Sequence, residues 1–243
     1  MDDLRERVVL VTGGTRGIGL AVARTLTAAG AAVVLTGRDE AAATEVAARL
    51  RAWRPDGGDV HGVAADVRDP ASLRAAVAAA VDRFGRLDAL IVNAGIGRMA
   101  PIQELGEEDW RAVVETNLTG AYHTVRAALD ALIASRGTIV TIGSLAGAHA
   151  FAGGAAYNAS KFGLVGFTEA IMHDLRDLGV RVATVMPGSV ATGFSRRSGG
   201  DDSWKLQADD VAAAVAFVLG SPTRALPSRI ELRPARKRPT GGG

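Results

Sequence analysis

Tyr157 and Lys161 stand four residues apart in the segment Tyr-Asn-Ala-Ser-Lys. Residues with this spacing share one face of a helix. A lysine ammonium beside a phenol favours the phenolate and therefore lowers the pKa of the tyrosine. A tyrosine adjusted in this way can pass a proton to a carbonyl oxygen near neutral pH. Because the chain contains only three lysines, this pair predicts acid–base chemistry rather than a chance spacing.

A second group of residues with chemical meaning is the glycine-rich segment 12–19, Thr-Gly-Gly-Thr-Arg-Gly-Ile-Gly. It lies where an apolar strand candidate meets the first helix candidate, and its glycines have the spacing G-x-x-x-G-x-G. Glycines let the backbone turn tightly and approach a pyrophosphate, whose charge is stabilised at a helix N-terminus. The segment therefore predicts a dinucleotide cofactor. The residues expected at that cofactor are Gly13, Thr15, Arg16, Gly17, Ile18 and Gly19.

Two arginines predict which dinucleotide is bound. Gly37-Arg38 follows the second strand candidate, where an NAD-binding fold would usually present an acid to the ribose 2′-hydroxyl. Arg38 and Arg16 suit a 2′-phosphate, which accepts charge-assisted bidentate hydrogen bonds, so NADP(H) is the predicted cofactor. Asp39 is interpreted as the N-cap of the next helix. The alternative, that both arginines are solvated surface residues, stays open because 25 of the 28 basic residues are arginine.

The elements that must position these residues follow from an alternation of short apolar runs and alanine-rich stretches. The apolar runs are nearly continuous, which is typical of strands buried on both faces. With right-handed crossovers, the alternation predicts an α/β fold with one doubly wound parallel sheet of about seven strands and helices on both faces. The expected strands are Val8–Thr12, Ala32–Thr36, Val60–Ala64, Ala89–Val92, Thr138–Ile142, Val180–Val185 and Arg229–Leu232. The expected helices are Ile18–Ala29, Glu40–Trp53, Pro70–Arg83, Glu107–Ser135, Ala155–Asp177 and Ala208–Leu219.

Composition limits the remaining possibilities. With 243 residues, 48% of them apolar, the chain can bury one sizeable core, and no Pro/Ser-rich linker divides it. Residues 1–233 are therefore predicted to form a single dinucleotide-binding and catalytic domain. The absence of cysteine excludes disulfides and a cysteine nucleophile, and the four histidines lack metal-ligand spacing, so no metal is expected. The charged N-terminus and the lack of an apolar span predict a cytoplasmic protein that does not enter the membrane.

Two segments are irregular. Residues 234–243 are basic and rich in proline and glycine, which predicts a disordered tail. Because the basic residues gather there and not over a broad face, nucleic-acid binding is not expected, and salt-dependent binding through Arg233–Arg238 is the alternative. Residues 187–207 form a glycine-rich stretch of about 20 residues, which predicts a lid or binding loop. A disordered surface insert is the alternative reading of that stretch.

With these motifs in view, the chain resembles the short-chain dehydrogenase/reductase family over residues 5–232. The resemblance implies a Rossmann-type fold and an NADP(H)-dependent oxidoreductase. Such an enzyme transfers a hydride between nicotinamide and a ketone or secondary alcohol, here as a carbonyl reductase. The matching motifs are T-G-x-x-x-G-x-G at 12–19, Asp66, N-A-G at 93–95, Asn117, Ser144, Y-x-x-x-K at 157–161, and Pro187-Gly188 with Thr192.

The resemblance also implies a role for each matching residue. Tyr157 would be the general acid/base, and Ser144 would hold the substrate oxygen. Lys161 would bind the nicotinamide ribose and lower the tyrosine pKa, while Asn117 would position a water in a proton relay. The other residues implied at the cofactor are Asp66 and Val67 at the adenine, Asn93, Ala94 and Gly95 along the adenosine ribose, Val190 and Thr192 at the carboxamide, and Pro187 and Gly188.

Simpler structural roles remain open for three of these residues. Asn117 could bond its own helix backbone, Ser144 could cap the turn after the fifth strand, and Asp66 could stabilise its loop.

The substrate is predicted less sharply. The expected pocket wall has no cation at its base, which favours a small apolar or weakly polar carbonyl compound. Arg196-Arg197 at the mouth leave an acidic carrier protein as an alternative. The chain lacks the V-x-G-G ending of many 3-oxoacyl-acyl-carrier-protein reductases, so reduction of a 3-oxoacyl thioester is the second hypothesis and a non-catalytic NADP(H)-binding sensor the third. The expected substrate residues are Ser144, Leu145, Ala150, Phe151, Tyr157, Gly188, Ser189, Phe194 and Trp204.

Self-association is expected from the helices 107–135 and 155–177. Both carry apolar residues on more faces than one sheet can cover. Small residues among them permit close approach of a second helix. A dimer or tetramer is therefore predicted.

Overall fold

The computed structural model describes residues 4–54, 56–193 and 202–236. Its centre is a seven-stranded sheet in the order β3-β2-β1-β4-β5-β6-β7, in which all neighbouring strands are parallel. The predicted doubly wound sheet is therefore confirmed. The strands are β1 (Val8–Val11), β2 (Ala32–Gly37), β3 (Val60–Ala64), β4 (Ala89–Val92), β5 (Thr138–Ile142), β6 (Arg181–Pro187) and β7 (Arg229–Leu232).

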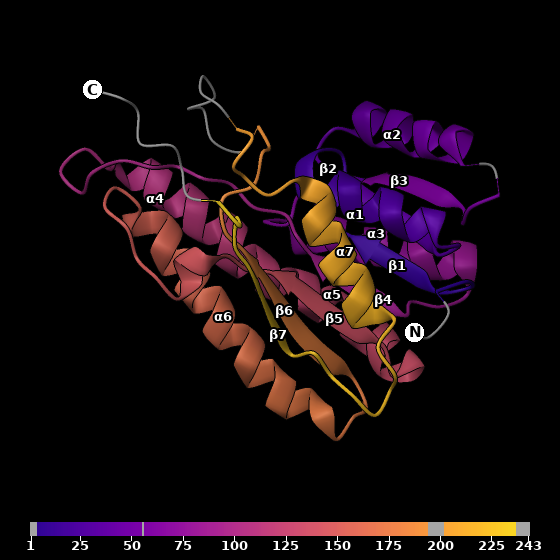
Figure 1. The fold of residues 1–243 in the computed structure, drawn as a ribbon. Coiled ribbons are helices and arrows are strands. Elements are labelled where there is room, and N and C mark those ends of the chain that lie inside the picture. The colour runs from indigo at the N-terminus through magenta and orange to yellow at the C-terminus, as the bar shows by residue number, and fades with distance from the viewer. Residues whose placement is uncertain (1–3, 55, 194–201, 237–243) are drawn as a thin grey trace.

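Helices cover both faces of this sheet (Figure 1). Helices α1, α2 and α7 pack on one face, against the side chains of Val9, Leu35 and Val185 among others. Helices α3, α5 and α6 pack on the other face, where Leu10, Leu90 and Ile139 point. Burial on both faces explains why the strands are nearly continuous apolar runs. The helices are α1 (Gly17–Ala28), α2 (Glu40–Trp53), α3 (Pro70–Phe84), α4 (Glu107–Val114), α5 (Gly120–Ser135), α6 (Ala155–Arg176) and α7 (Ala208–Leu219).

Side-chain caps fix two helix starts that the sequence predicts. The Asp39 carboxylate accepts a hydrogen bond from the Ala42 amide at 2.9 Å, and Asp69 accepts bonds from the Ala71 and Ser72 amides. Each bond satisfies an amide that has no partner within its own helix. Pro70 follows Asp69 at the first helical position, where a missing amide hydrogen costs nothing.

The predicted helix Glu107–Ser135 is not continuous. A five-residue π-helical segment, η1 (Glu115–Thr119), separates α4 from α5. Such segments occur frequently at functional sites, and this one contains Asn117. None of the described helices is long and apolar enough to span a membrane.

Strand order reverses between β1 and β4, because the chain builds outward from β1 to β3 on one side and from β4 to β7 on the other. In open α/β sheets, ligands bind at the carboxyl ends of the strands beside such a switch point. The segments that leave β1 and β4 at this edge are Thr12–Gly19 and Asn93–Gly95. The fold thus brings two of the predicted motifs to one place.

Candidate active site

The turn between β1 and α1 has a shape that only glycine permits. Gly13 and Gly17 have φ angles of +65° and +55°, in the left-handed region that side chains disfavour. A Cβ added at Gly19 would lie 2.3 Å from the carbonyl oxygen of Gly13. The first turn of α1 can therefore approach the end of β1 only because position 19 has no side chain.

The same turn places the amino end of α1 at the edge of the sheet where β1 ends. Arg16 precedes the helix in extended backbone geometry, no side chain caps the helix, and its first turn holds no acid. Amide groups at such an end lack partners within the helix and attract anions. The tight glycine turn and this uncapped end fit a dinucleotide pyrophosphate, and Gly13, Gly17 and Gly19 are the residues that would cradle it.

Hydrogen bonds tie the segments after β1 and β4 together. The Thr12 hydroxyl accepts bonds from the Asn93 and Ala94 amides, at 3.0 and 3.2 Å. In return, the Asn93 side-chain amide donates to the carbonyl oxygens of Thr12 and Gly13, at 2.8 and 3.1 Å. Asn93 therefore holds the glycine turn in place, a positioning role that the sequence motif alone does not indicate.

Charged groups lie at the ends of β2 and β3. Arg38 is exposed after Gly37, and Arg16 is exposed in the glycine turn. The Arg68 guanidinium, 2.6 Å from the Asp66 carboxylate, is the main reason why the pKa of Asp66 is held below its ordinary value, and Arg38 adds a smaller effect of the same sign. Asp66 is thus engaged in its own loop, as the simpler structural alternative expected, while Val67 beside it is buried.

Asn117 joins three segments of the site. Its side-chain carbonyl accepts a bond from the Ile96 amide at 2.8 Å, and its amide donates to the Ile96 carbonyl at 2.9 Å. The same amide donates to the Ser160 hydroxyl at 3.1 Å. The alternative that Asn117 bonds its own helix backbone is wrong, because all three of these partners lie outside η1.

Ser144 lies just after β5, at the start of the short 3₁₀ turn η2 (Leu145–Gly147). Its hydroxyl accepts a bond from the Ala146 amide at 3.1 Å, so it caps this turn as the structural alternative proposed. It also bonds the Tyr157 hydroxyl, an interaction that acts to lower the tyrosine pKa. One side chain therefore shapes the loop and contacts the phenol.

Tyr157 and Lys161 project from the first turns of α6, as their spacing predicts, but their electrostatics differ from the expectation. Burial of the phenol is the larger effect and raises the pKa of Tyr157 above its ordinary value. The Lys161 ammonium donates to the Ile142 carbonyl at 2.9 Å and lies 5.8 Å from the centre of the tyrosine ring. In this structure the pKa of Tyr157 is therefore raised by burial, whereas the Tyr–Lys spacing predicted that it would be lowered. Burial instead lowers the pKa of Lys161 to about 8.

Two residues inside the Tyr-Asn-Ala-Ser-Lys motif have positioning roles that the sequence analysis missed. Asn158 is buried, and its amide donates to the carbonyl oxygens of Ala146 and His149, at 3.2 and 3.4 Å. Ser160 is fully buried between Asn117 and the Tyr157 carbonyl. The only signal in the sequence was the position of these two residues beside the predicted acid/base. A polar residue that is buried there needs a hydrogen-bond partner.

The predicted substrate residues lie on two sides of the Ser144–Tyr157 pair. On one side, the exposed Phe151 ring is 6.5 Å from the Tyr157 ring. On the other, Gly188 follows β6, and a Cβ there would lie 3.2 Å from Leu145 and 3.1 Å from Pro234. Ala150 is exposed at the end of the η2 loop, and Ser189 accepts a bond from the Leu206 amide at 3.0 Å. Phe194, Arg196 and Arg197 lie outside the described residues.

The described part of segment 187–207 folds back on itself. Val190 and Leu206 form a parallel bridge, and the Ala191 amide donates to the Leu206 carbonyl at 2.8 Å. Thr192 lies over the glycine turn, where a Cβ at Gly17 would approach its methyl group to 3.6 Å. Thr192, expected at the carboxamide, therefore lies close to Gly17, expected at the pyrophosphate.

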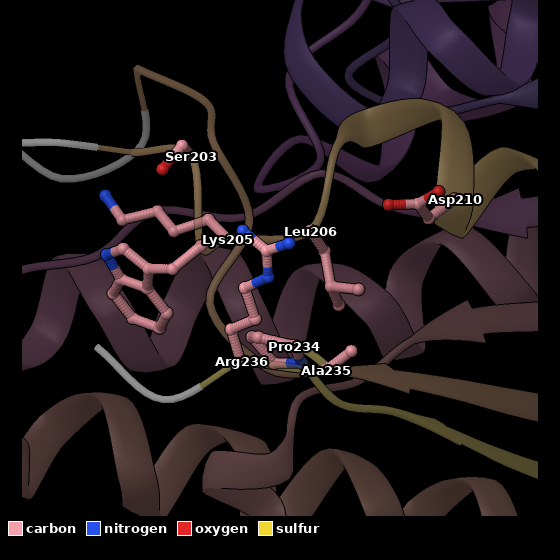
Figure 2. Close-up of a pocket in the computed structure, with 8 residues that line it drawn as sticks. Ser203, Lys205, Leu206, Asp210, Pro234, Ala235 and Arg236 are labelled. Atoms are coloured by element: carbon pink, nitrogen blue, oxygen red, sulfur yellow. The ribbon is translucent and has the colours of Figure 1, made fainter. Parts of the chain in front are cut away.

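A pocket of about 240 Å³ adjoins this segment (Figure 2). It is lined by residues 203–206 before α7, by Asp210 in α7 and by the segment after β7. Residues 234–236 were predicted to belong to a disordered tail, yet they form a wall of this pocket; residues 237–243 lie outside the described residues. The lining residues are Ser203, Trp204, Lys205, Leu206, Asp210, Pro234, Ala235 and Arg236.

Comparison with known proteins identifies the family. The model for short chain dehydrogenases matches residues 7–202. A putative ketoacyl reductase of the monensin polyketide synthase from Streptomyces virginiae is 43% identical over 200 residues, which are 81% of this chain and 76% of the relative. A 3-oxoacyl-acyl-carrier-protein reductase of Escherichia coli is 34% identical over 223 residues, covering 87% of this chain and 89% of the relative.

Solved structures agree with this assignment. A short chain dehydrogenase from Burkholderia cenocepacia in complex with NADP has a TM-score of 0.85 and 35% identity, covering 96% of this chain and 97% of the other. An alcohol dehydrogenase from Thermococcus sibiricus complexed with 5-hydroxy-NADP has a TM-score of 0.88 and 28% identity, covering 96% and 98%. The sequence motifs, the parallel sheet and these matches lead to one conclusion: the chain belongs to the short-chain dehydrogenase family.

Proposed function

We propose that this chain is an NADP(H)-dependent carbonyl reductase in which Tyr157 is the general acid. The observation that carries the proposal is the meeting of Ser144, Tyr157 and Lys161 after β5, at the same edge of the sheet from which the glycine turn leaves β1. The cofactor, when bound, supplies the hydride for the carbonyl carbon. Relatives named as ketoacyl reductases and neighbours solved with NADP support the same reaction class.

The chain's own residues account for the proton and for substrate placement. Ser144 holds the carbonyl oxygen near the phenol, and Tyr157 donates its proton to that oxygen as negative charge develops there. A raised tyrosine pKa keeps this proton in place through neutral pH. Lys161 provides a positive charge behind the phenol, and Asn117 with Ser160 fixes the first turn of α6 against the end of β4.

A 3-oxoacyl thioester is the second candidate substrate. Two of the relatives carry names that include ketoacyl or 3-oxoacyl reduction, and the pocket beside α7 has Lys205 and Arg236 in its wall (Figure 2). These cations would suit an acidic or phosphate-bearing carrier. Comparison of kcat/KM for simple ketones, quinones and 3-oxoacyl thioesters, all with NADPH, separates the two candidates.

We also propose that the chain associates through the outer surface of α5 and α6. Tyr122 and Phe162 are 48% and 45% exposed there. The Phe167 ring lies edge-on to Tyr122 at 6.5 Å, and a Cβ at Gly166 would meet no neighbouring atom. An exposed aromatic group beside a small residue suits close packing of a second copy.

The substitution Tyr157→Phe tests whether Tyr157 is the general acid. The ring packing is retained and only the proton donor is lost, so kcat for ketone reduction is expected to fall at least about 100-fold. NADPH affinity, measured by fluorescence titration, is expected to stay within about twofold because the variant leaves the cofactor cradle intact. Tyr122→Phe, the equivalent change at the chain's other tyrosine, is the matched control. Activity of Tyr157→Phe within about tenfold of wild type would contradict the assignment.

Reduction is expected to slow as pH rises through about 8. Burial lowers the pKa of Lys161 to about 8, so the ammonium is charged below that pH and neutral above it. The charge behind the phenol is then lost on the alkaline side, while Tyr157, with its raised pKa, still holds its proton. A profile of kcat/KM between pH 6 and about 10 measures this alkaline decrease. The charge of Lys161→Arg persists across this range, so the decrease should occur at higher pH in the variant. An identical decrease in both proteins would exclude Lys161 as its source.

Arg38→Ala is expected to lower kcat/KM for NADPH much more than kcat/KM for NADH. A charge-assisted hydrogen bond contributes about 1.5–3 kcal/mol. Because Arg38 is exposed, we expect a smaller effect, which corresponds to about a tenfold loss in kcat/KM for NADPH. Arg49→Ala, an equally charged change on the outer face of α2, is the control. Gly37→Asp is a less direct test, because its Cβ would lie 2.6 Å from the Thr15 methyl group. Equal losses for both cofactors would show that Arg38 does not select the 2′-phosphate.

Phe162→Glu is expected to reduce the molar mass of the protein measured by light scattering at micromolar concentration. The new charge would be buried at the proposed contact without a partner. Trp53→Glu changes an aromatic residue that is 56% exposed on α2, away from this surface, and should leave the mass unchanged. A monomeric wild-type protein would overturn the proposed association.

A further inference from the structure

The pocket beside α7 begins next to the residues that contact Ser144 (Figure 2). The Ser144 hydroxyl lies 3.5 Å from the carbonyl oxygen of Pro187, and Gly188 follows directly. A Cβ added at Gly188 would lie 3.1 Å from Pro234 and 3.2 Å from Leu145. Position 188 therefore lets Pro234, which belongs to the wall of the pocket, lie close to the residue that follows Ser144.

Backbone hydrogen bonds attach both walls of the pocket to this segment. The Leu206 amide donates to the Ser189 carbonyl at 3.0 Å, which holds the wall that precedes α7. The Gly188 amide donates to the Leu232 carbonyl at 2.8 Å, which holds the segment that follows β7. The pocket is therefore built on the same backbone that contacts the serine of the candidate active site.

The two walls run away from that backbone. Leu206 and Pro234 are the lining residues next to the attachment points. Trp204 lies two residues before Leu206, and Arg236 lies two residues after Pro234. Leu206 and Pro234 thus form the end of the pocket near Ser144, and Trp204 and Arg236 form the far end.

Arg236 carries the charge in this lining that the protein does not use. The Lys205 ammonium lies 2.5 Å from the Asp202 carboxylate. The Asp210 carboxylate accepts a bond from the Gln207 amide at 2.8 Å, at the start of α7. Among the residues that the structure describes, the Arg236 guanidinium has no hydrogen-bond or ion-pair partner. One guanidinium is therefore available to a ligand at the far end.

The shape and polarity of the pocket suit part of a molecule. Its volume of about 240 Å³ is below the range of about 300–1,000 Å³ found for whole small-molecule sites. Trp204, Leu206 and Pro234 are half-buried and offer apolar surface. Figure 2 shows the Arg236 side chain extending from the segment after β7 toward the segment that holds Leu206. An apolar stem that ends in an anion matches this arrangement.

We propose that the pocket is the far part of the substrate site and selects ketones that carry a carboxylate or phosphate on an apolar stem. The inference rests on the proposed carbonyl reductase activity. With the carbonyl oxygen at Ser144, the stem packs against Leu206, Pro234 and Trp204, and the anion bonds Arg236. Guanidinium groups bind both anions through paired, charge-assisted hydrogen bonds.

Calorimetric titration of the full chain tests this assignment. The probes are methyl ketones of several chain lengths that end in a carboxylate, in a phosphate, or in the methyl ester of that carboxylate. Saturating NADP⁺ occupies the glycine turn and has no hydride to transfer, so the titration measures binding without turnover. At the best chain length, one anionic ketone is expected to bind about tenfold more tightly than the ester at low salt. The order of carboxylate and phosphate identifies the preferred anion.

Three variants separate the charge of Arg236 from general effects. Arg236→Gln is expected to remove the preference for the anionic ketone and to change ester affinity by less than about twofold. Arg49→Gln, the same change on the outer face of α2, should keep the preference. Ala235→Phe reduces the space in the pocket, so it should weaken the long ketones more than butanone.

Turnover with NADPH distinguishes failure of this inference from failure of the proposed function. If wild type reduces none of the ketones, the proposed function is overturned, and this inference with it. If wild type reduces them but binds anion and ester equally at every length, only the subsite is overturned. The same holds if Arg236→Gln keeps the preference, if Arg49→Gln loses it equally, or if Ala235→Phe binds long ketones as wild type does.

Discussion

The hydrogen bonds between Thr12 and Asn93 are the interaction on which the rest of the site depends. Parallel strands that build outward in two directions leave an opening where their loops diverge, and β1 and β4 border that opening. Without a link, the glycine turn and the loop after β4 could separate. The Thr12 hydroxyl and the Asn93 amide join them through four bonds of 2.8–3.2 Å. These bonds hold the glycine turn at a fixed distance from the loop after β4, and through that loop from Asn117.

A second set of hydrogen bonds connects the loop after β4 to α6. Asn117 bonds both backbone groups of Ile96, which follows the β4 loop, and then the hydroxyl of Ser160. Ser160 in turn donates to the Tyr157 carbonyl at 2.8 Å. Buried polar networks with every partner in place are rigid, because an unmade bond there is costly. Asn117 lies in the π-helical segment η1, so the helix departs from regular α-helical geometry at the residue that makes these bonds.

The sequence predicted the parts of this structure that local chemistry determines. Continuous apolar runs located all seven strands, Asp39 and Asp69 located two helix starts, and the glycine spacing located the turn after β1. It did not predict the break at Glu115–Thr119, where Asn117 bonds Ile96, a residue distant in sequence. It did not predict the upward direction of the Tyr157 pKa, because that direction comes from burial, which outweighs the hydrogen bond from Ser144. Residues 234–236 resemble a tail in composition, and only the structure places Pro234 near Gly188 and all three residues in the lining of the pocket beside α7.

The two ends of the sheet impose opposite electrostatic conditions. In a doubly wound fold, helices that return between parallel strands place their amino ends beside the carboxyl ends of the strands, and their carboxyl ends at the other edge. Partial positive charge therefore gathers at the catalytic edge and partial negative charge at the far edge. At the edge where the strands end, the uncapped first turn of α1 and the glycine turn leave backbone amides without partners in the helix. At the far edge the ends of the helices favour positively charged side chains, and Arg86, Arg136 and Arg181 lie there. The direction of the parallel strands therefore determines which charge suits each edge.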